Sequence, residues 1–186
     1  MDIFSAFGLS ASAGLNAYIP LLVVALLSRF THLITLKSPW NTLESWWVIG
    51  VLIVLSIVEF FADKVPAVNH INDIIQTVIR PVAGAIVFAA SAQIITDVHP
   101  VLAMIMGLFV AGVVHTVKSL AIRPAVTATT GGAGNVPVSI AEDAISTVIS
   151  ILAAIAPVLI AVILVLGGAL IVWLIWRHIN RERARI

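Results

Sequence analysis

Long apolar stretches, interrupted by short polar segments, dominate the sequence. A stretch of about 20 mainly apolar residues can cross a bilayer, because the hydrocarbon core is about 30 Å thick and a helix rises about 1.5 Å per residue. The pattern therefore predicts an all-α fold: a polytopic bundle of about six transmembrane helices that forms a single integral membrane domain over residues 1–186. The predicted spans cover residues 3–28, 46–61, 81–96, 101–120, 139–156 and 157–176.

The last apolar run, residues 138–176, is too long for one span. As a single helix it would measure about 58 Å. Proline removes a helical hydrogen bond and clashes with the preceding turn, so we predict a break at Ala156–Pro157. In the alternative, residues 138–150 re-enter the membrane and one long tilted helix follows.

Residues 67–80 have an amphipathic pattern, with apolar residues on one helical face and polar residues, including Asp73 and Arg80, on the other. Such a helix lies at the membrane interface or folds into the protein as a re-entrant piece. We expect it on the cytoplasmic side. It is either a connector with a solvated face or a segment whose Asp73 and Arg80 face a cavity.

The first predicted span is irregular around Asn16, Tyr18 and Pro20. Pro20 cannot donate a hydrogen bond to the Asn16 carbonyl, which is therefore left free. One interpretation is a proline-kinked packing helix, since small residues surround this point. The other is a broken helix that lines a substrate pathway, with Asn16 and Tyr18 as polar contacts.

Two pairs of short segments resemble each other: residues 13–20 with 133–137, and residues 77–81 with 119–124. Interruptions at matching places in two halves of a membrane protein indicate inverted repeats of the transporter type. Chance similarity is the alternative for matches this short.

The composition supports a membrane protein. Hydrophobic residues make up 61% and charged residues 10% of the chain, against about 45–50% and about 25% in soluble domains. This excludes an ordinary cytosolic enzyme, a disordered chain and a nucleic-acid-binding module. The chain has no cysteine, which excludes disulfides and thiolate metal sites.

The distribution of Lys and Arg predicts the orientation, because basic residues concentrate in cytoplasmic loops. Four arginines follow Trp176, so we expect a cytoplasmic C-terminus, and an even number of spans places the N-terminus there too. Lys64, Arg80, Lys118 and Arg123 fall on this inner side, and Arg29 and Lys37 on the outer side. We predict a multi-pass protein of the bacterial inner membrane, in contact with the lipid bilayer.

The candidate substrate site combines basic residues with a glycine-rich stretch. Arg80, Lys118 and Arg123 are candidates to hold an anionic small molecule or a lipid phosphate. Backbone N–H groups before a helix also suit an anion. The candidates in the glycine-rich stretch are Gly131, Gly132 and Asn135.

Ser139 and Glu142 fit a capping box, which predicts a helix that starts near Ile140. No Gly-Lys-Ser/Thr sequence follows the glycine-rich stretch, so this is not a Walker loop.

Five acidic residues are candidates for proton or ion coupling. Glu59 and Asp63 lie one helical turn apart at the end of an apolar span, where ionisable residues are functional by default. A hard cation would need several such oxygen ligands, and salt bridges with the nearby Lys and Arg residues are the alternative that we favour. The spacing matches no metal motif, and we predict no metal or cofactor. The five are Glu59, Asp63, Asp73, Glu142 and Asp143.

These polar segments carry a family resemblance. An uncharacterised bacterial membrane-protein family, domain of unknown function 4126, has similar residues at 14–20, 59–66, 130–135 and 142–143, and at Asp73, Thr77, Arg80 and Pro81. The resemblance covers essentially the whole chain. It implies a small multi-span membrane protein and no established activity.

Three functions are compatible with this sequence. The leading hypothesis is a transporter or permease for an anionic or phosphate-bearing substrate, acting as a homo-oligomer. The second is a non-catalytic membrane scaffold or assembly partner. The third is a membrane-embedded enzyme that acts on a lipid phosphate with His115 or Asp63 as base, although no catalytic signature is present.

Overall fold

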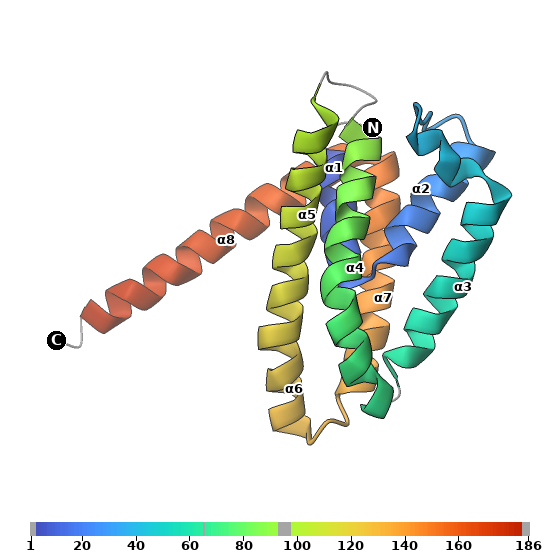
Figure 1. Ribbon diagram of the computed structural model, residues 1–186. Helices are drawn as coiled ribbons and strands as arrows, with labels where there is room; N and C mark the ends of the chain where they lie inside the picture. The colour runs from blue at the N-terminus through green and yellow to red at the C-terminus, as the bar shows by residue number, and fades with distance from the viewer. Residues whose placement is uncertain (1–2, 65, 93–97, 184–186) are drawn as a thin grey trace.

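Within residues 3–64, 66–92 and 98–183, which the computed structural model describes, all regular structure is helical (Figure 1). The predicted all-α fold is confirmed. The elements are α1 (Ile3–Leu15), α2 (Tyr18–Phe30), η1 (Trp40–Glu44), α3 (Trp46–Ala62), α4 (Pro66–Ala92), α5 (Pro100–Val117), η2 (Lys118–Ile122), α6 (Arg123–Thr130), α7 (Asn135–Ile155) and α8 (Pro157–Arg183).

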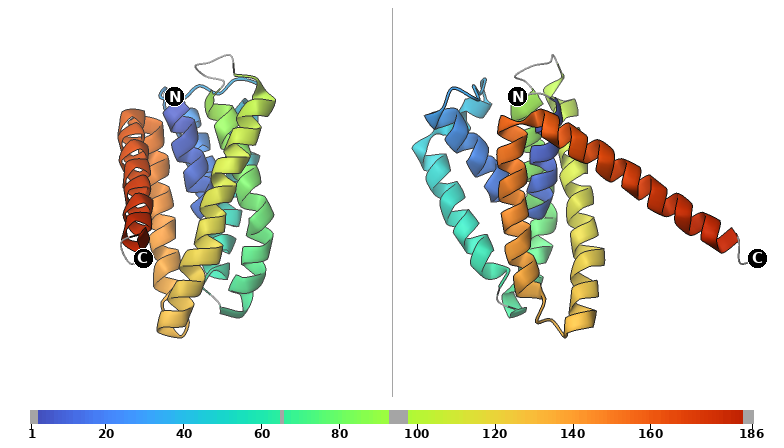
Figure 2. Two further views of the ribbon diagram at one scale, coloured as in Figure 1. Left: turned by 90° about the vertical axis from the view of Figure 1, so that its left-hand side faces the viewer. Right: turned by 180° about the vertical axis from the view of Figure 1, so that it is seen from behind.

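Helix α1 lies at the centre of the bundle. It packs against α4, α5 and α7, which run beside it and extend beyond its C-terminal end (Figure 1). Helices α2 and α3 lie on one side, and α8 slopes away from the other helices (Figure 2). A buried apolar core around Leu9, Ala13, Val24 and Val87 joins α1, α2 and α4.

The first predicted span is wrong, because residues 3–28 form two short helices. Helices α1 and α2 have 13 residues each, which is about 20 Å and too short for the hydrocarbon core. They form a V-shaped hairpin whose open end lies beside η1 and the start of α3 (Figures 1 and 2). Both ends of the hairpin therefore lie at the same end of the bundle, and its tip lies inside the bundle.

Asn16 explains the break at the hairpin tip. Its side-chain oxygen accepts hydrogen bonds from the backbone N–H groups of Tyr18 and Ile19, both at 3.1 Å. This satisfies donors at the start of α2 that have no partner within the helix. Pro20 removes the hydrogen bond that would have continued the helix through Asn16. The segment is therefore a broken helix rather than a kinked one, and its role in a substrate pathway stays a prediction.

Hydroxyl groups attach the hairpin to α7. The Ser12 hydroxyl donates to the Ser146 carbonyl at 2.8 Å, and it lies 2.7 Å from the hydroxyls of both Ser146 and Ser150. All three side chains are fully buried. Hydrogen bonds of this kind join helices in membranes, where the hydrophobic effect gives little attraction between helices.

Helix α4 corrects two predictions. The amphipathic segment 67–80 and the described part of the predicted span 81–96 form one helix, Pro66–Ala92, with Pro81 inside it. Residues 93–96 of that span lie outside the described residues. The segment is therefore neither a separate interfacial helix nor a re-entrant piece, and it belongs to a long helix whose polar face points into the bundle at Gln76 and Arg80.

Helices α4 and α5 cross with their backbones in contact. A Cβ atom placed on Gly107 would lie 2.3 Å from the carbonyl oxygen of Gly84 and 2.5 Å from the Phe88 Cβ. The Gly84 carbonyl also accepts a hydrogen bond from the Ser10 hydroxyl at 2.9 Å, so α1 is fixed at the same point. Small residues permit such close approach between membrane helices.

Residues 121–137, which lie between the predicted spans 101–120 and 139–156, are largely helical. Helix α5 continues through the π-helical turn η2 into α6, where Pro124 occupies the first turn, a position that tolerates proline because its missing N–H has no helical partner there. Helix α7 begins at Asn135 rather than near Ile140. Ser139 is buried within the helix instead of capping it, so the predicted capping box is wrong.

The chain breaks at Ala156–Pro157, as predicted. Helix α7 is continuous over 21 residues, so the alternative in which residues 138–150 re-enter is not supported. Among the described residues, three stretches are long and apolar enough to cross a membrane, namely Ile71–Ala92, Pro100–Thr130 and Asn135–Ile155. Helix α3 and the apolar part of α8, Pro157–Leu170, are shorter. The count of six spans is not confirmed.

The start of α1 lies at one end of the bundle, and α8 runs from that end towards the level of the other (Figure 1). The hairpin turns back where one crossing helix was expected. The side of the membrane on which each terminus lies stays a prediction.

Candidate functional site

Six charged side chains are buried together among the described residues, below the tip of the hairpin. They come from α3, α4, η2, α6 and α7 and from the residue that follows α3. Each has at most 7% of its surface exposed. Three are acidic and three are basic, so their formal charges cancel. We refer to Glu59, Asp63, Arg80, Lys118, Arg123 and Glu142 as the charge network.

Arg80 lies in the first half of the network. Its Nη2 is 2.9 Å from the Glu59 Oε1 and 3.8 Å from the Asp63 Oδ2. Its Nη1 donates to the His115 Nδ1 at 3.2 Å. Glu59 and Asp63 are one turn apart on α3 and its C-terminal end, so the guanidinium of Arg80 bridges both carboxylates.

Glu142 lies in the second half of the network and pairs with two basic residues. Its Oε2 lies 2.8 Å from the Arg123 Nη2 and 2.8 Å from the Lys118 Nζ. The Arg123 Nη2 is also 3.4 Å from the Asp63 Oδ2. Asp63 therefore connects the two halves, because both arginines lie near its Oδ2.

The hairpin tip contacts the network and its neighbour Asp143 through opposite charges. The Lys118 ammonium donates to the Leu15 carbonyl at 3.0 Å, which lies at the negative end of the α1 dipole. The Asn16 amide donates to the Asp143 Oδ1 at 3.0 Å, close to the positive end of α2. The C-terminal end of α1 thus faces a basic side chain of η2, and the N-terminal end of α2 faces an acidic side chain of α7.

Replacing Asn16 with alanine is expected to destabilise the protein by about 1–2 kcal/mol, because the cap of α2 is lost. The Asp143 contact is lost too. Unfolding in detergent, followed by tryptophan fluorescence, would measure the change. Asn41→Ala is the matched control, since Asn41 is exposed at the other end of the bundle. Equal stability of the two variants would contradict the capping role.

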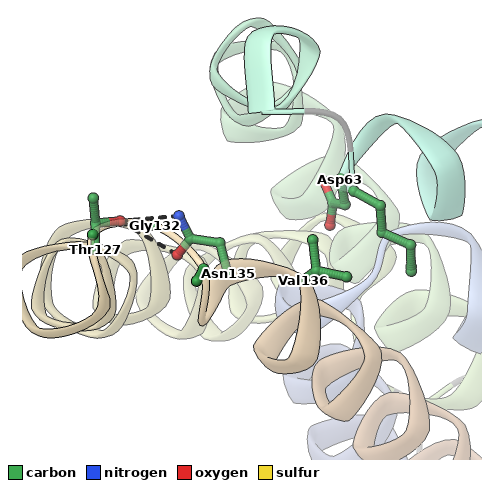
Figure 3. A pocket seen from close by; sticks show the side chains of 8 residues that line it. Asp63, Thr127, Gly132, Asn135 and Val136 are labelled. Atoms are coloured by element: carbon green, nitrogen blue, oxygen red, sulfur yellow. Dashed lines mark hydrogen bonds between the residues drawn. The ribbon is translucent and has the colours of Figure 1, made fainter.

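Asp63 also opens onto a cavity of about 580 Å³ (Figure 3). It lines this cavity together with Lys64 and residues of the α6–α7 turn, although only 3% of its surface is exposed. Its Oδ1 accepts from the Asn72 amide at 2.7 Å, and its Oδ2 accepts from the Ser139 hydroxyl at 3.4 Å. A solute in the cavity can therefore approach the carboxylate that connects the network.

The opposite wall of the cavity is the turn between α6 and α7. Gly131 and Gly132 adopt φ values of 62° and 92°, which permit the tight reversal and favour glycine. The Asn135 amide donates to the Thr127 hydroxyl at 3.0 Å across the turn (Figure 3). The three candidates of the glycine-rich stretch therefore lie on the cavity wall.

The remaining candidates take different places. Asp143 lies beside the network and pairs with Lys64 at 3.3 Å. Tyr18 is 8% exposed in the apolar core and does not line the cavity at Asp63. The Asp73 Oδ1 is buried and makes no hydrogen bond with any described residue.

The salt-bridge interpretation of the acidic residues agrees with these contacts. In the described part of the chain, no group of three or more His, Cys, Asp or Glu side chains is arranged to hold a metal ion. Asn72 and the interior position of Ser139 were missed. Asn72 lies in α4, and its position relative to Asp63 depends on how the chain connects α3 to α4.

His115 is fixed as a neutral hydrogen-bonding group. Its Nδ1 must accept, because its partner Arg80 has only donors. Its Nε2 then carries the proton and donates to the Thr77 hydroxyl at 3.1 Å. Both ring nitrogens are occupied, and the ring is 2% exposed.

Comparison with known proteins gives one match. The family model described as "Domain of unknown function (DUF4126)" matches residues 3–177. No curated protein and no solved structure matches the chain.

Proposed function

We propose that this chain, which belongs to the DUF4126 family, is a membrane transporter that moves a small anionic or phosphate-bearing substrate together with a proton. Its apolar helices are those of a small membrane protein. The observation that carries the proposal is the position of Asp63, between two buried arginines and on the wall of a cavity.

The charge balance of the network explains why a proton would accompany the substrate. Each basic group already has a carboxylate partner, and an unpaired buried charge is costly. An incoming anion must therefore replace a carboxylate. If a proton neutralises Asp63 and one anionic charge takes its place beside Arg80 and Arg123, the sum of the charges stays at zero.

Glu59 would hold Arg80 during this exchange. It is one helical turn deeper than Asp63 and has the shorter contact with the same Nη2 atom, 2.9 Å against 3.8 Å. Arg80 can therefore lose the Asp63 contact and keep a buried counter-ion. Lys118 and Arg123 share Glu142 in the same way.

The hairpin tip would form the barrier to the other side of the membrane. Above the network, α1 fills the space between α4, α5 and α7. Its contacts there are hydroxyl hydrogen bonds and a Lys118–carbonyl contact, at 3.0 Å, that tilting the hairpin would break. In transporters, interrupted helices of this type line the substrate site.

We place the network end of the bundle in the cytoplasm, since Lys and Arg concentrate there. The end of α2, which carries Arg29, and the following segment up to η1, which includes Lys37, lie towards the opposite end (Figure 1). The C-terminus is then cytoplasmic, as expected from the sequence, and the start of α1 faces the other side. The membrane in this assignment is the bacterial inner membrane, and a homo-oligomer stays a prediction.

Asp63→Asn tests the coupling directly. We expect liposomes that contain the wild-type protein and an internal pH dye to acidify when phosphate or a small carboxylate is added outside at acidic pH. The amide introduced by this substitution imitates the protonated carboxyl group. Proton uptake by the variant should therefore fall to the level of empty liposomes, while exchange of labelled substrate across the membrane continues.

Glu44→Gln is the matched control, because Glu44 lies outside the network near the start of α3 and should retain proton uptake. Wild-type-like acidification by Asp63→Asn would overturn the coupling role. If no anion of the panel moves protons with the wild-type protein, the scaffold interpretation replaces transport. The enzyme interpretation receives no support from His115, whose ring nitrogens bind Arg80 and Thr77.

A further inference from the structure

A second opening lies on the side of the bundle, between α2, α3 and α7. It is a groove of about 340 Å³ whose walls are Ile19, Ile57, Phe60 and Phe61. Asn16 and the Asp143 side chain, also in the lining, are 2% and 14% exposed, against 39–62% for Ile57, Phe60 and Phe61. The groove is thus apolar where it opens and polar inside, which suits an amphiphile.

An ammonium group supplied by the chain itself lies beside the polar end of the groove, on Lys64, which contacts the lining residues Asp143 and Phe60 without lining the groove. The Lys64 Nζ is 3.3 Å from the Asp143 Oδ2 and donates to the Phe60 carbonyl at 2.8 Å. It also lies 3.2 Å from the centre of the Phe60 ring, where a cation is attracted by the π electrons. A carboxylate, a carbonyl and a ring face together form a complete site for a primary ammonium.

Lys64 and Asp143 form a weak ion pair. Their side chains are 15% and 14% exposed, and a partly exposed ion pair is stabilising by about 1 kcal/mol or less. Lys64 also lines the cavity at Asp63, so its side chain has room to turn away from Asp143. A ligand that offers an ammonium to Asp143 and an anion to Lys64 can therefore replace the pair without leaving either charge alone.

We infer that this groove binds a zwitterionic phospholipid with a primary ammonium headgroup. The lipid ammonium takes the place of Lys64 between Asp143 and Phe60, and Lys64 turns to the lipid phosphate. One acyl chain lies along Ile19 and Ile57. The site follows the C-terminal end of α3, which on our assignment is at the cytoplasmic membrane surface, where headgroups lie.

The same geometry predicts selectivity among lipids. An anionic lipid without an ammonium leaves Asp143 unpaired when Lys64 turns to its phosphate. A quaternary ammonium keeps the charge but has no N–H to donate to Asp143 and the Phe60 carbonyl. The site therefore prefers phosphatidylethanolamine to phosphatidylcholine and phosphatidylglycerol. This inference does not depend on whether the protein transports anything.

Native mass spectrometry of the purified protein, titrated with each of these three lipids in detergent, would test the inference. We expect the first bound phosphatidylethanolamine to be retained about tenfold more strongly than the other two lipids, which is the effect of one hydrogen bond to a charged group. Asp143→Asn keeps the size of the side chain and an oxygen for Asn16, and it should remove this preference.

Ile57→Trp should remove tight retention of phosphatidylethanolamine by filling the groove. Val58→Trp is its control, since Val58 is on the same helix, is similarly exposed and does not line the groove. Equal retention of the three lipids by the wild-type protein would overturn the inference. So would a preference that survives in both Asp143→Asn and Ile57→Trp.

Discussion

Replacing Arg80 with glutamine is expected to destabilise the protein by about 3–5 kcal/mol, because removal of one partner leaves buried charges uncompensated. Arg80 is fully buried and lies within 4 Å of both Glu59 and Asp63. Without its guanidinium, two carboxylates one helical turn apart repel each other, and the His115 Nδ1 loses its donor. Denaturant-induced unfolding in micelles would measure the loss.

A double substitution separates the charge effect from the loss of packing. Glu59→Gln combined with Arg80→Gln removes the closest pair together, so it should be more stable than Arg80→Gln alone. Arg29→Gln is the control: Arg29 is exposed and stacks on Trp46, and its loss should cost less than about 1 kcal/mol. An Arg80→Gln variant as stable as Arg29→Gln would show that the network does not stabilise the bundle.

Gly107→Ala is expected to destabilise the protein by about 3 kcal/mol, at the upper end of the usual cost of overpacking. The added methyl would lie 2.3 Å from the Gly84 carbonyl oxygen, so α4 and α5 must move apart. That movement also disturbs the hydrogen bond from Ser10 to the same carbonyl, which fixes the hairpin. The cost thus includes a contact of α1 as well as the helix crossing.

Gly50→Ala is the matched control, since nothing lies within 4 Å of a Cβ at Gly50. It should be neutral or stabilising by up to about 1 kcal/mol, the helix-propensity gain of alanine. Thermal unfolding of the two variants in the same detergent would compare them directly. If the two substitutions have the same effect, the close approach of α4 and α5 does not contribute to stability.

Two features encoded in the local sequence were predicted well. The apolar runs predicted the all-α fold, and Pro157 predicted the break between α7 and α8. The polar residues around Asn16 indicated a broken helix, but nothing local indicates that the chain turns back there. That reversal is decided by contacts with residues more than 100 positions away, such as Lys118 and Asp143.

The members of the charge network could also be predicted from the sequence, because charged residues are rare in this chain and their opposite signs favour pairing. The contacts between these members could not be predicted. Asp63 is linked to residues of α4, α6 and α7 through helix packing, which the sequence does not specify. Ser139 shows the difficulty most clearly: its spacing to Glu142 fits a cap, but its position inside α7 makes it a partner of Asp63 instead.

The central position of α1 has a consequence for biosynthesis. The ribosome makes the hairpin before α4, α5 and α7, the helices that enclose it. The Leu15 carbonyl, Asn16 and Ser12 gain their partners in the rest of the bundle only when Lys118, Asp143 and Ser146 have been made. Contacts between distant parts of a chain form late, so the hairpin is made before the helices that enclose it but is among the last parts of the bundle to fold.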